Sequence, residues 1–501
     1  MPLGLDRFLS PLQGQPTLGT LLERLAKLNG NRRMVEEAGG GLDLTYAQAA
    51  KRVARWAAGM AQKAEPGSRV VIATGNGYEM LLLCLAASRA GMVPVPVNPQ
   101  MRPEEIRHVV SDSGASLNVR TAAEVDGPDL LTETVPADPS DIAALFYTSG
   151  TTGKPKGVQQ THKALVGGFS LASVVPPQLL RVEAVIALPI AHIMGFAAAL
   201  GLASAGIAVY FLPKFRPDDV LDAIESRRAA IFIGVPAMYR MMLEAGAERR
   251  DLKSVRVWVS GADAMPADLA ARYKKLGATV TLPVFGSRGE AVFADGYGMV
   301  ETGGGAVMKV SPPFLATGLG SDAVGFPLPG YRLRVVGEDG GEVGPGATGE
   351  LLIKGPGITT GYWGDAGATG AVLTDDGWLR TGDLARKGPL GTVLFAGRAK
   401  DVIKSGGYSV YAAEVERALE EHPDVLEAAV VGLPDERKGE VPAAAVRLRS
   451  GVTLDEARLD AWANDKLARY KVPVRFVAVE ELPRTGTNKV QKRELLPLFL
   501  P

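Results

Sequence analysis

The chain has 501 residues, of which 46% are hydrophobic, and its 55 Lys and Arg residues balance its 55 Asp and Glu residues. This length predicts about three domains, or fewer if some are large, and the apolar content suffices for sizeable cores. The neutral balance gives no indication of a nucleic-acid or anionic-membrane surface. Cys84 is the only cysteine, which excludes disulfides within the chain, and its apolar neighbours predict a buried structural thiol. Residues 1–8 lack the features of a secretory signal, so we expect a cytoplasmic protein.

The first hundred residues alternate between helical and strand patterns. Leucines at helical spacing predict an amphipathic helix over residues 15–36, and a second helix is expected after Thr45, which can cap it. Residues 69–74 are typical of a strand, 79–90 of a helix and 92–97 of an extended segment. Strands that alternate with helices at this spacing favour an α/β fold, with a parallel sheet covered by helices on both faces.

A glycine- and threonine-rich stretch, residues 146–158, begins within the apolar run 142–147, which is typical of a buried strand. Its glycines allow backbone N–H groups to approach an anion, while its hydroxyls and Lys154 and Lys156 favour phosphate. It is not a Walker A loop, because Lys154 is followed by Pro155. A solvated surface turn is the alternative, but the length of the stretch favours a polyphosphate-binding loop.

Residues 147–157 resemble the signature loop of the adenylate-forming (ANL) superfamily, which comprises acyl-CoA synthetases, luciferase-type ligases and adenylation domains of peptide synthetases. The resemblance implies a large N-terminal domain of parallel α/β sheets with a small β-barrel, and a smaller, mobile α+β C-terminal domain. It also implies ATP, Mg²⁺ and CoA as cofactors or substrates. The nucleotide contacts that it assigns to the loop are Thr148, Ser149, Gly150, Thr151, Thr152, Gly153 and Lys156.

Residues 184–213 are apolar enough to be mistaken for a membrane span, but Pro189 and three glycines interrupt them. We therefore expect a strand, a turn, a buried helix and a strand. Within them, residues 188–195 are similar to the family segment that carries a gate at the acyl site. The resemblance assigns His192 as the gate and Gly195 as the pocket floor, and an ordinary hydrogen-bonded histidine is the alternative.

The α/β alternation continues, with a helix expected over residues 219–227, a strand over 230–235 and a helix over 236–245. Residues 257–266 then predict a strand that breaks into a turn of small residues. The family places a similar turn against the adenine and the acyl chain, so Ser260, Gly261 and Ala262 are candidate walls of both sites. A simple strand-to-helix connection explains the same pattern.

Residues 295–302 resemble the family's Tyr-Gly-x-Thr-Glu motif. An aromatic ring can stack on a base, and carboxylates can accept from an amine or hold a hard cation. The resemblance assigns Tyr297 to adenine stacking, Asp295 to the adenine amine and Glu301 to catalysis through magnesium, with Gly296 and Gly298 as further nucleotide contacts.

Two features depart from this motif. Val300 stands where the family usually has threonine, which leaves open whether Thr302 replaces the missing hydroxyl. The run 285–294 is longer than the family pattern at that place, and we expect it to reshape the acyl pocket or its mouth.

Residues 325–395 are rich in Gly and Pro, and short strands are expected at 331–336, 349–354 and 390–396, as in a small β-barrel or sheet. Residues 378–383 match a family motif whose aspartate holds the ribose hydroxyls. The resemblance thus assigns Asp383 to the ribose and Arg398 to a second ribose or phosphate contact. It places the domain boundary here, with an N-terminal domain over 1–397 and a C-terminal domain over 398–501 that rotates about a hinge near Lys400.

The last hundred residues predict an α+β unit: a turn at 404–408, helices over 412–422 and 454–467, and strands over 425–433 and 443–448. Residues 482–495 match the family's closing motif. The resemblance places Lys489 where it bridges negative charge between the acid and the phosphate, which suits a point charge on a flexible stem. It assigns Lys404 to catalysis and Gly406 and Gly407 to CoA. A solvated lysine in a basic tail is the alternative for Lys489.

These features together imply an ATP-dependent acyl-CoA synthetase, which forms an acyl-AMP from a carboxylic acid and then transfers the acyl group to CoA. Residues 190–200 lack the aspartate that amino-acid-activating relatives use. Small apolar residues there favour a medium- or long-chain fatty acid, with an aromatic acid second. The alternatives are an acyl-AMP ligase that loads a carrier protein and a non-catalytic relative that binds nucleotide or acyl groups. A homodimer stays open.

Overall fold

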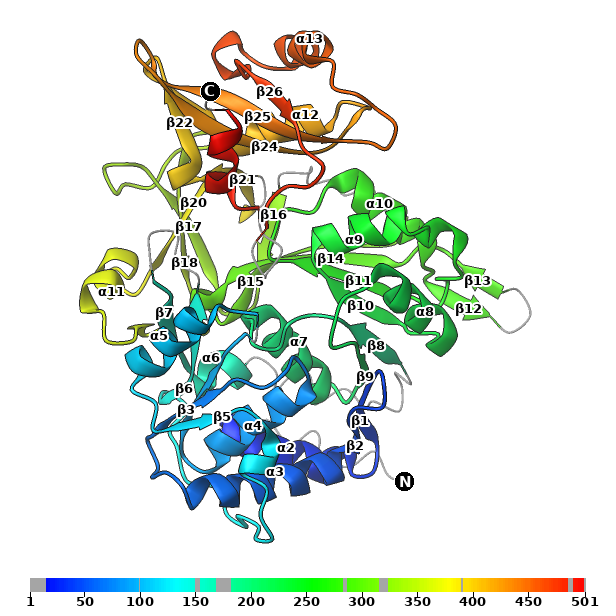
Figure 1. Ribbon diagram of the computed structural model, residues 1–501, viewed down its shortest axis with the longest axis vertical. Helices are drawn as coiled ribbons and strands as arrows, with labels where there is room; N and C mark the ends of the chain where they lie inside the picture. Colours follow the sequence, from blue (N-terminus) through cyan, green and yellow to red (C-terminus); the bar gives the residue numbers. More distant parts are fainter. Residues whose placement is uncertain are drawn as a thin grey trace. The chain divides into compact units, whose positions relative to one another are not determined.

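The computed structural model describes residues 15–98, 100–148, 154–167, 182–282, 286–314, 323–388, 391–484 and 490–499. The chain divides into two compact units, and Figure 1 labels their helices and strands. The first comprises Met1–Arg332 and Ile353–Leu379, and the second Leu333–Leu352 and Arg380–Pro501. The predicted rotation boundary at 397/398 stays a prediction.

Three helices lie side by side at the start of the first unit: α2 (Leu18–Asn29), α3 (Tyr46–Ala61) and α4 (Tyr78–Arg89) (Figure 1). Thr45 caps α3, as predicted, by accepting the N–H of Gln48. The helix predicted over 15–36 is too long, because α2 ends at Gly30 and Arg33–Glu37 forms strand β1. Met34 and Val35 are buried there, so burial in a sheet overrides the helical pattern.

A small parallel sheet follows, in the order β4-β3-β5. Its strands are β3 (Arg69–Ile72), β4 (Val93–Pro96) and β5 (Leu117–Val119), and α5 (Pro103–Ser113) connects the last two. Cys84 on α4 is fully buried and burial raises its pKa, which confirms the prediction of a structural thiol.

The larger sheet of the first unit has a parallel centre in the order β14-β11-β10-β8-β9-β1. Beside β1, these strands are β8 (Glu183–Ile186), β9 (Ala208–Phe211), β10 (Ile231–Gly234), β11 (Val257–Gly261) and β14 (Val292–Met299). Antiparallel strands flank them: β2 (Asp43–Thr45) pairs with β1, while β15 (Gly304–Ser311) and β16 (Ala323–Pro327) follow β14.

Helices cover both faces of this sheet, as expected (Figure 1). One apolar cluster joins α7 (Ile193–Ser204) to Ile186 and Ile233, and another joins α8 (Pro217–Arg227), α9 (Pro236–Glu244) and α10 (Ala267–Leu276) to Phe232 and Trp258. The order β8, α7, β9 confirms the strand, turn, helix and strand predicted over 184–213. In the part of the chain that the structure describes, no helix has the length and apolar character of a membrane span.

A third sheet, antiparallel and in the order β19-β7-β6, frames the predicted phosphate loop. Its strands are β6 (Ile142–Thr148), β7 (Lys156–Thr161) and β19 (Gly361–Tyr362), with the short helices α6 (His162–Val166) and α11 (Ala366–Val372) beside them. Single 3-10 turns complete the unit at Ala122–Glu124, Ala247–Arg249 and Val300–Thr302, and the last of these is η7.

In the second unit, the Gly- and Pro-rich segment forms β17 (Arg332–Val336), β18 (Thr348–Lys354), β20 (Leu379–Lys387) and β21 (Val393–Arg398). These strands follow the order β17-β18-β20-β21, so the structure has the sheet among the two arrangements, a small β-barrel or a sheet, that were expected for this segment. The described part of β17 has β18 as its neighbour and does not pair with β21, so the strands do not close on themselves.

The C-terminal part of this unit is the predicted α+β arrangement. Its sheet has the order β23-β22-β25-β24, with β26 beside β25. Alternate residues of β24 pack on opposite faces: Val430 against α12 and α13, and Val431 against Leu495 of η11. The elements are β22 (Val402–Ser405), β23 (Tyr408–Tyr411), α12 (Ala412–Glu420), β24 (Val425–Asp435), β25 (Gly439–Leu448), α13 (Glu456–Lys466), β26 (Phe476–Ala478), and the 3-10 turns η9 (Ala399–Asp401), η10 (Arg469–Lys471) and η11 (Lys492–Leu498).

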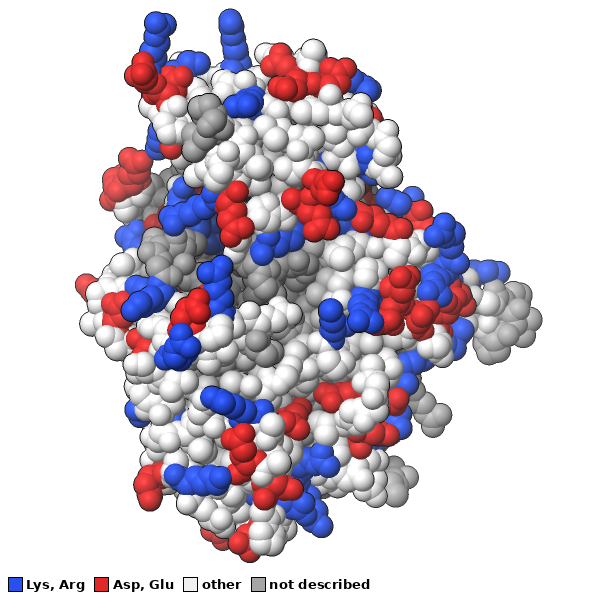
Figure 2. Space-filling view, in the orientation of Figure 1, with Lys and Arg blue, Asp and Glu red and all other residues white. Residues whose placement is uncertain are grey.

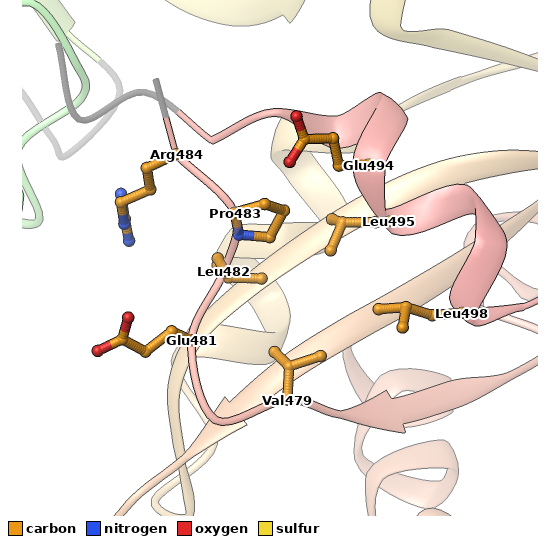
Figure 3. A pocket seen from close by; sticks show the side chains of 8 residues that line it. All are labelled: Val479, Glu481, Leu482, Pro483, Arg484, Glu494, Leu495 and Leu498. Carbon is orange, nitrogen blue, oxygen red and sulfur yellow. The ribbon is translucent and has the colours of Figure 1, made fainter. Parts of the chain in front are cut away.

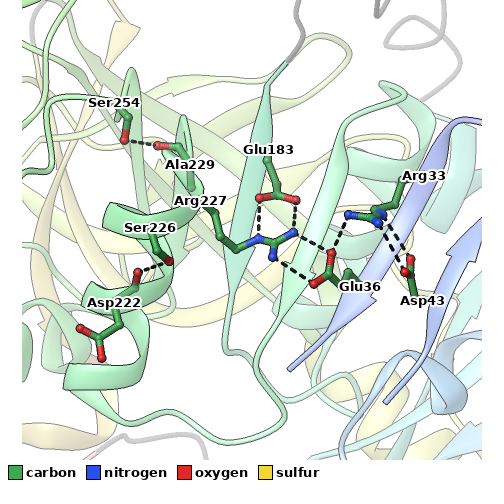
Figure 4. Close-up of polar contacts among 9 residues, drawn as sticks. All are labelled: Arg33, Glu36, Asp43, Glu183, Asp222, Ser226, Arg227, Ala229 and Ser254. Atoms are coloured by element: carbon green, nitrogen blue, oxygen red, sulfur yellow. Dashed lines mark hydrogen bonds and ion pairs between the residues drawn. The ribbon is translucent and has the colours of Figure 1, made fainter. Parts of the chain in front are cut away.

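Acidic and basic side chains are interspersed on the face drawn in Figure 2, in keeping with the balanced composition. Among the described residues, one group of ion pairs ties α8 to two strands of the sheet (Figure 4). Arg227, at the end of α8, donates to both carboxylate oxygens of Glu183 on β8 and of Glu36 on β1. Its guanidinium lies 4.1 Å from the ring centre of Tyr210, on the intervening strand β9. Glu36 is bonded in turn to Arg33.

We predict that Arg227→Gln lowers the free energy of unfolding of the first unit by about 2 kcal/mol, because Glu183 and Glu36, both partly buried, lose a partner that donates to both of their carboxylate oxygens, and only Glu36 keeps another, Arg33. Arg272→Gln is the matched control, since Arg272 binds Glu248 through two nitrogens at the exposed surface, where such a pair contributes less than about 0.5 kcal/mol. Denaturant unfolding of both variants measures the difference, and equal losses would contradict the prediction.

The effect of Arg227→Gln should also depend on pH. The hydrogen bond from Arg227 lowers the pKa of Glu36, so this pair stabilises the fold above the unfolded pKa of glutamate, about 4.3. That stability is lost as the pH falls through the lowered folded pKa. The gap between the wild-type and Arg227→Gln unfolding free energies should therefore narrow when the unfolding titration is repeated below about pH 4.

Candidate active site

The predicted phosphate loop connects two paired strands. Thr148 at the end of β6 lies opposite Lys156 at the start of β7, and Tyr147 lies opposite Gly157. A side chain at 157 would come within 2.9 Å of the Tyr147 ring, so this glycine allows the strands to pack around the ring. The Tyr147 hydroxyl donates to Asp112 of α5 at 2.7 Å. Both ends of the loop are thus held, while Ser149, Gly150, Thr151, Thr152 and Gly153 lie outside the described residues.

Lys156 projects toward the segment that pairs with β7 on its other side. Its Nζ is 2.9 Å from Asp365 Oδ2 and 5.7 Å from the ring centre of Tyr362. Asp365 also caps α11 by accepting the N–H of Ala368. This hydrogen bond, and to a lesser extent the one from Lys156, lowers the pKa of the Asp365 carboxyl group. Because Lys156 is half exposed, its charge stays available to a ligand at the loop.

Tyr362 connects this lysine to the Tyr-Gly motif, since its hydroxyl donates to Glu301 Oε1 at 2.8 Å. Glu301 lies in η7 and is 7% exposed, and its backbone carbonyl accepts the N–H of Thr359 at 2.8 Å. Gln160 of β7 donates to the carbonyl of Val300 at 2.6 Å. The structure therefore places Lys156 beside the ring of Tyr362 and Glu301 at its hydroxyl, although the two residues were predicted from separate motifs. The sequence analysis did not identify Tyr362.

Thr302 does not replace the hydroxyl that Val300 lacks. Its side chain is fully buried, accepts the N–H of Met299 at 2.9 Å and donates to the carbonyl of Gly304 at 2.6 Å. The hydroxyl proton is used inside the turn, so it cannot also contact a phosphate.

The candidate adenine contacts lie where β11 ends beside the middle of β14. Ser260 pairs with Asp295, and Gly261 pairs with Gly296. The pairing therefore places the predicted wall residues of β11 beside the predicted nucleotide contacts of β14. Burial raises the pKa of Asp295 to about 6, against the opposing charge of Lys309 on β15, whose Nζ is 4.0 Å from Asp295 Oδ2. Asp295 Oδ1 and Ser260 Oγ are buried without a hydrogen bond of good geometry. This arrangement offers an acceptor to a donor group such as an amine.

Gly296 and Gly298 of the Tyr-Gly motif differ in the space that is available for a side chain. A Cβ at Gly298 would lie 1.8 Å from the carbonyl oxygen of Gly304, so packing alone requires this glycine. A Cβ at Gly296 would meet nothing closer than the Ser260 carbonyl at 3.7 Å, and its φ is not in the left-handed region. Tyr297 is partly exposed on the same strand. Ala262, which follows β11, adopts a φ of +69°, an uncommon conformation for a residue with a side chain.

The candidate acyl residues lie at the start of α7. His192 caps this helix, and its Nδ1 accepts the N–H of Met194 at 3.2 Å. A Cβ at Gly195 would lie 2.2 Å from the carbonyl oxygen of Pro189, so close packing accounts for this glycine whether or not it borders a pocket. A Cβ at Gly261 would lie 3.4 Å from Met194, and one at Gly304 would lie 3.3 Å from Ala197. The first turns of α7 therefore pack against the strand ends through small residues.

The run before β14 has a different position from the one expected. Its described residues 286–288 form β13 (Gly286–Arg288), which pairs with β12 (Val280–Leu282) as a hairpin, and its last residues, 292–294, begin β14. This hairpin precedes the amino end of β14, whereas the candidate residues lie toward carboxyl ends of parallel strands. The expectation that it reshapes the acyl pocket is therefore not supported.

In the second unit, the two predicted ribose contacts are partners of each other. Asp383 on β20 pairs with Arg398 on β21, and Arg398 Nε lies 3.1 Å from Asp383 Oδ1. Asp383 is 2% exposed, while Arg398 is partly exposed. Lys400, the predicted hinge, lies in η9, and burial lowers its pKa.

The residues predicted for CoA form a tight hairpin turn. Gly406 and Gly407 connect β22 to β23 with φ values of +58° and +84°, which favour glycine at both positions. Lys404 on β22 donates to the hydroxyl of Ser409 at 2.9 Å. Lys489 lies outside the described residues.

A hollow of about 640 Å³ on the second unit contains none of the predicted residues (Figure 3). The segment after β26 and η11 line it, and Arg484 at its rim is bonded to Glu427 of β24. The lining residues are Val479, Glu481, Leu482, Pro483, Arg484, Glu494, Leu495 and Leu498.

Comparisons with known proteins agree with the motifs. Residues 22–363 match the model of the AMP-binding enzyme family, and residues 414–489 match its C-terminal domain. Feruloyl-CoA synthase from Amycolatopsis sp is 35% identical over 96% of this chain and 99% of its own length. Indoleacetate–CoA ligase from Aromatoleum aromaticum is 34% identical over 91% of this chain and 93% of its own length.

A solved structure agrees as well. The o-succinylbenzoate CoA synthetase from Bacillus subtilis, in complex with its acyl-adenylate intermediate, superposes with a TM-score of 0.81 at 27% identity, covering 96% of this chain and 98% of that one. The α/β fold class, with a large N-terminal domain and a smaller C-terminal one, is thereby confirmed, as is the prediction of an enzyme of this ligase class. The chain belongs to the AMP-binding enzyme family, within the adenylate-forming superfamily that its motifs resemble.

Proposed function

We propose that the protein is an AMP-forming acid–thiol ligase that activates an aromatic carboxylic acid with ATP and transfers the acyl group to CoA. The observation that carries the proposal is the cluster around Tyr362, where Lys156 from the phosphate loop and Glu301 from the Tyr-Gly motif meet. The similarity to CoA ligases over nearly the whole chain supports the same reaction.

In the first half-reaction, a carboxylate oxygen attacks the α-phosphorus of ATP, the bond to the β-phosphate oxygen breaks, and pyrophosphate leaves. Positioning and charge stabilisation are what the protein contributes to such a step. We assign the phosphates to Thr148, Lys156 and residues 149–153, and the bridging positive charge to Lys489.

Magnesium fits this assignment at Glu301. Among the described residues, no group of three or more His, Cys, Asp and Glu side chains could hold a metal by itself. Magnesium characteristically uses one or two carboxylates together with substrate phosphates, and the buried carboxylate of Glu301 near Lys156 offers this arrangement. The ion, when bound, would neutralise phosphate charge.

We assign the rest of the nucleotide as the resemblance implies. Asp295 accepts from the adenine amine, and Tyr297 stacks on the base, with Gly261, Ala262, Gly296 and Gly298 around it. The buried acceptor Asp295 Oδ1 supports the first of these roles. We assign Asp383 and Arg398 to the ribose, where an acceptor-only carboxylate suits two hydroxyl donors.

In the second half-reaction, the thiol sulfur of CoA attacks the acyl carbonyl carbon and the bond to the AMP oxygen breaks. We assign Lys404, Gly406 and Gly407 to this step. The 1–397 and 398–501 domains and a hinge at Lys400 belong to the same proposal, because the first half-reaction occurs at the α-phosphorus and the second at the acyl carbon, and each needs its own groups there.

The proposed acid differs from the one that the sequence favoured. Small residues on α7 had suggested a medium- or long-chain fatty acid, but the relatives described above act, by their names, on ferulate, indoleacetate and o-succinylbenzoate, all of which carry aromatic rings. We propose His192, Gly195, Ser260 and Gly261 as acyl contacts. A carrier protein as acceptor, a homodimer and a cytoplasmic location stay predictions.

We expect AMP release from ATP and magnesium to depend on CoA and to be fastest with an aromatic acid. The measurement compares ferulate, indoleacetate, 2-succinylbenzoate, octanoate and palmitate, each with and without CoA. Faster turnover of palmitate would overturn the aromatic assignment while keeping the ligase. Pyrophosphate exchange without CoA-dependent turnover would indicate a carrier protein as acceptor, and no turnover at all would contradict the proposed function.

Two glycine variants separate nucleotide contact from packing. Gly298→Ala should lower the unfolding free energy by about 1–3 kcal/mol, because its Cβ would overlap a backbone oxygen. Gly296→Ala should leave stability within about 0.5 kcal/mol but weaken AMP binding about tenfold, since the new methyl group lies where the base is proposed to lie. Thermal unfolding and calorimetric AMP titration measure the two effects. Unchanged AMP affinity in Gly296→Ala would remove this residue from the site.

Lys489→Ala should slow acyl-AMP formation about 10²–10³-fold and spare thioester formation from supplied acyl-AMP, because its charge is needed only as pyrophosphate leaves. Lys492→Ala is the matched control, since Lys492 Nζ lies 2.7 Å from Glu416 Oε1 and serves an ion pair within the second unit. Pyrophosphate exchange measures the first half-reaction. Normal exchange by Lys489→Ala would refute the assignment.

A further inference from the structure

Tyr362 occupies the junction between the two motifs, and its backbone is fixed on both sides. It lies opposite Val158 in the pairing of β19 with β7. Its N–H donates to the hydroxyl of Thr369 in α11 at 2.9 Å, and the N–H of the next residue, Trp363, donates to the carbonyl of Gly157 at 2.7 Å. The tyrosine therefore moves with the strand that carries the phosphate loop.

The side chain of Tyr362 has two separable contacts. Its ring lies beside Lys156 Nζ, and its hydroxyl donates to Glu301 Oε1. A phenolic donor bound to Oε1 restricts the rotation of the carboxylate and still leaves lone pairs for a cation.

We propose that Tyr362 is a positioning residue for metal binding. Its hydroxyl orients the Glu301 carboxylate, and its place on β19 keeps that carboxylate at a fixed position relative to Lys156. The proposal rests on the proposed role of Glu301 as metal ligand. Partners that orient a ligating carboxylate generally affect metal affinity about 10–100-fold when removed. Removing the Tyr362 hydroxyl should therefore weaken metal binding and leave the turnover rate at saturating metal concentration close to the wild-type rate.

Tyr362→Phe tests this, because it removes the hydroxyl and keeps the ring beside Lys156. Tyr331→Phe is the matched control: the Tyr331 hydroxyl donates to the carbonyl of Thr302 at 3.1 Å, next to Glu301 in the chain, but to no carboxylate. The full-length protein is titrated with Mn²⁺ in the presence of ATP and without acid, and bound Mn²⁺ is measured by electron paramagnetic resonance. Thermal unfolding of each variant is measured alongside.

We expect Tyr362→Phe to weaken Mn²⁺ binding about tenfold, and Tyr331→Phe to leave it unchanged. In turnover, the Mg²⁺ concentration for half-maximal rate should rise similarly in Tyr362→Phe, while the rate at saturating Mg²⁺ stays close to the wild-type value. Unchanged metal affinity in Tyr362→Phe, or equal losses in both variants, would overturn the inference.

Glu301→Gln distinguishes this inference from the proposal on which it rests. If Glu301→Gln leaves Mn²⁺ binding unchanged, Glu301 is not the ligand and the proposed metal role fails. If Glu301→Gln weakens binding but Tyr362→Phe does not, the metal role stands and only the positioning role is wrong. If both weaken it, the double variant should bind Mn²⁺ no more weakly than Glu301→Gln alone, because Tyr362 acts through Glu301.

Discussion

The pairing of β7 with β6 on one side and β19 on the other is the constraint on which the candidate site depends. It brings Tyr362 beside Lys156, although about two hundred residues separate them in the chain. From this position the Tyr362 hydroxyl reaches Glu301, which η7 presents from the end of β14. Backbone hydrogen bonds thus set the distance between a cation and a carboxylate. A flexible loop alone could not fix this distance, since each side chain would find its own rotamer.

The parallel sheet supplies the other half of the arrangement. Because β11 and β14 are parallel neighbours, Ser260 lies beside Asp295 near the carboxyl end of β11, and Lys309 on β15 faces Asp295 from the next strand. Burial is the main reason why the pKa of Asp295 rises. The farther strands are tied together by Arg227, which binds carboxylates on β8 and β1 across β9. Rigid strands therefore place groups that loops could not hold.

Local patterns predicted most elements, and nonlocal contacts account for the failures. The apolar run around Cys84 and the interrupted apolar segment 184–213 were interpreted correctly, because an element that is buried on all sides leaves an almost unbroken apolar run in the sequence. The helix predicted over 15–36 missed β1, whose Val35 is buried by pairing with β2 and β9. Glu301 was found through its motif, but Tyr362 was not, because its role comes from a contact sixty-one positions away. Asp383 and Arg398 were named separately, and only the register of β20 with β21 shows that they are a pair.

Val300 limits how the phosphate charge can be stabilised. The sequence left open whether Thr302 supplies the missing hydroxyl, and its buried bonds to Met299 and Gly304 exclude this while the turn is intact. A hydroxyl contributes one hydrogen-bond donor to a phosphate, whereas an ammonium group contributes a donor and a positive charge. Losing the threonine hydroxyl therefore costs less phosphate stabilisation than losing a lysine would. In the proposed site, the negative charge of the phosphates is then balanced by Lys156, by Lys489 and by the cation that Glu301 would hold. For this reason the orientation of the Glu301 carboxylate should matter more in this chain than in a relative that keeps the threonine.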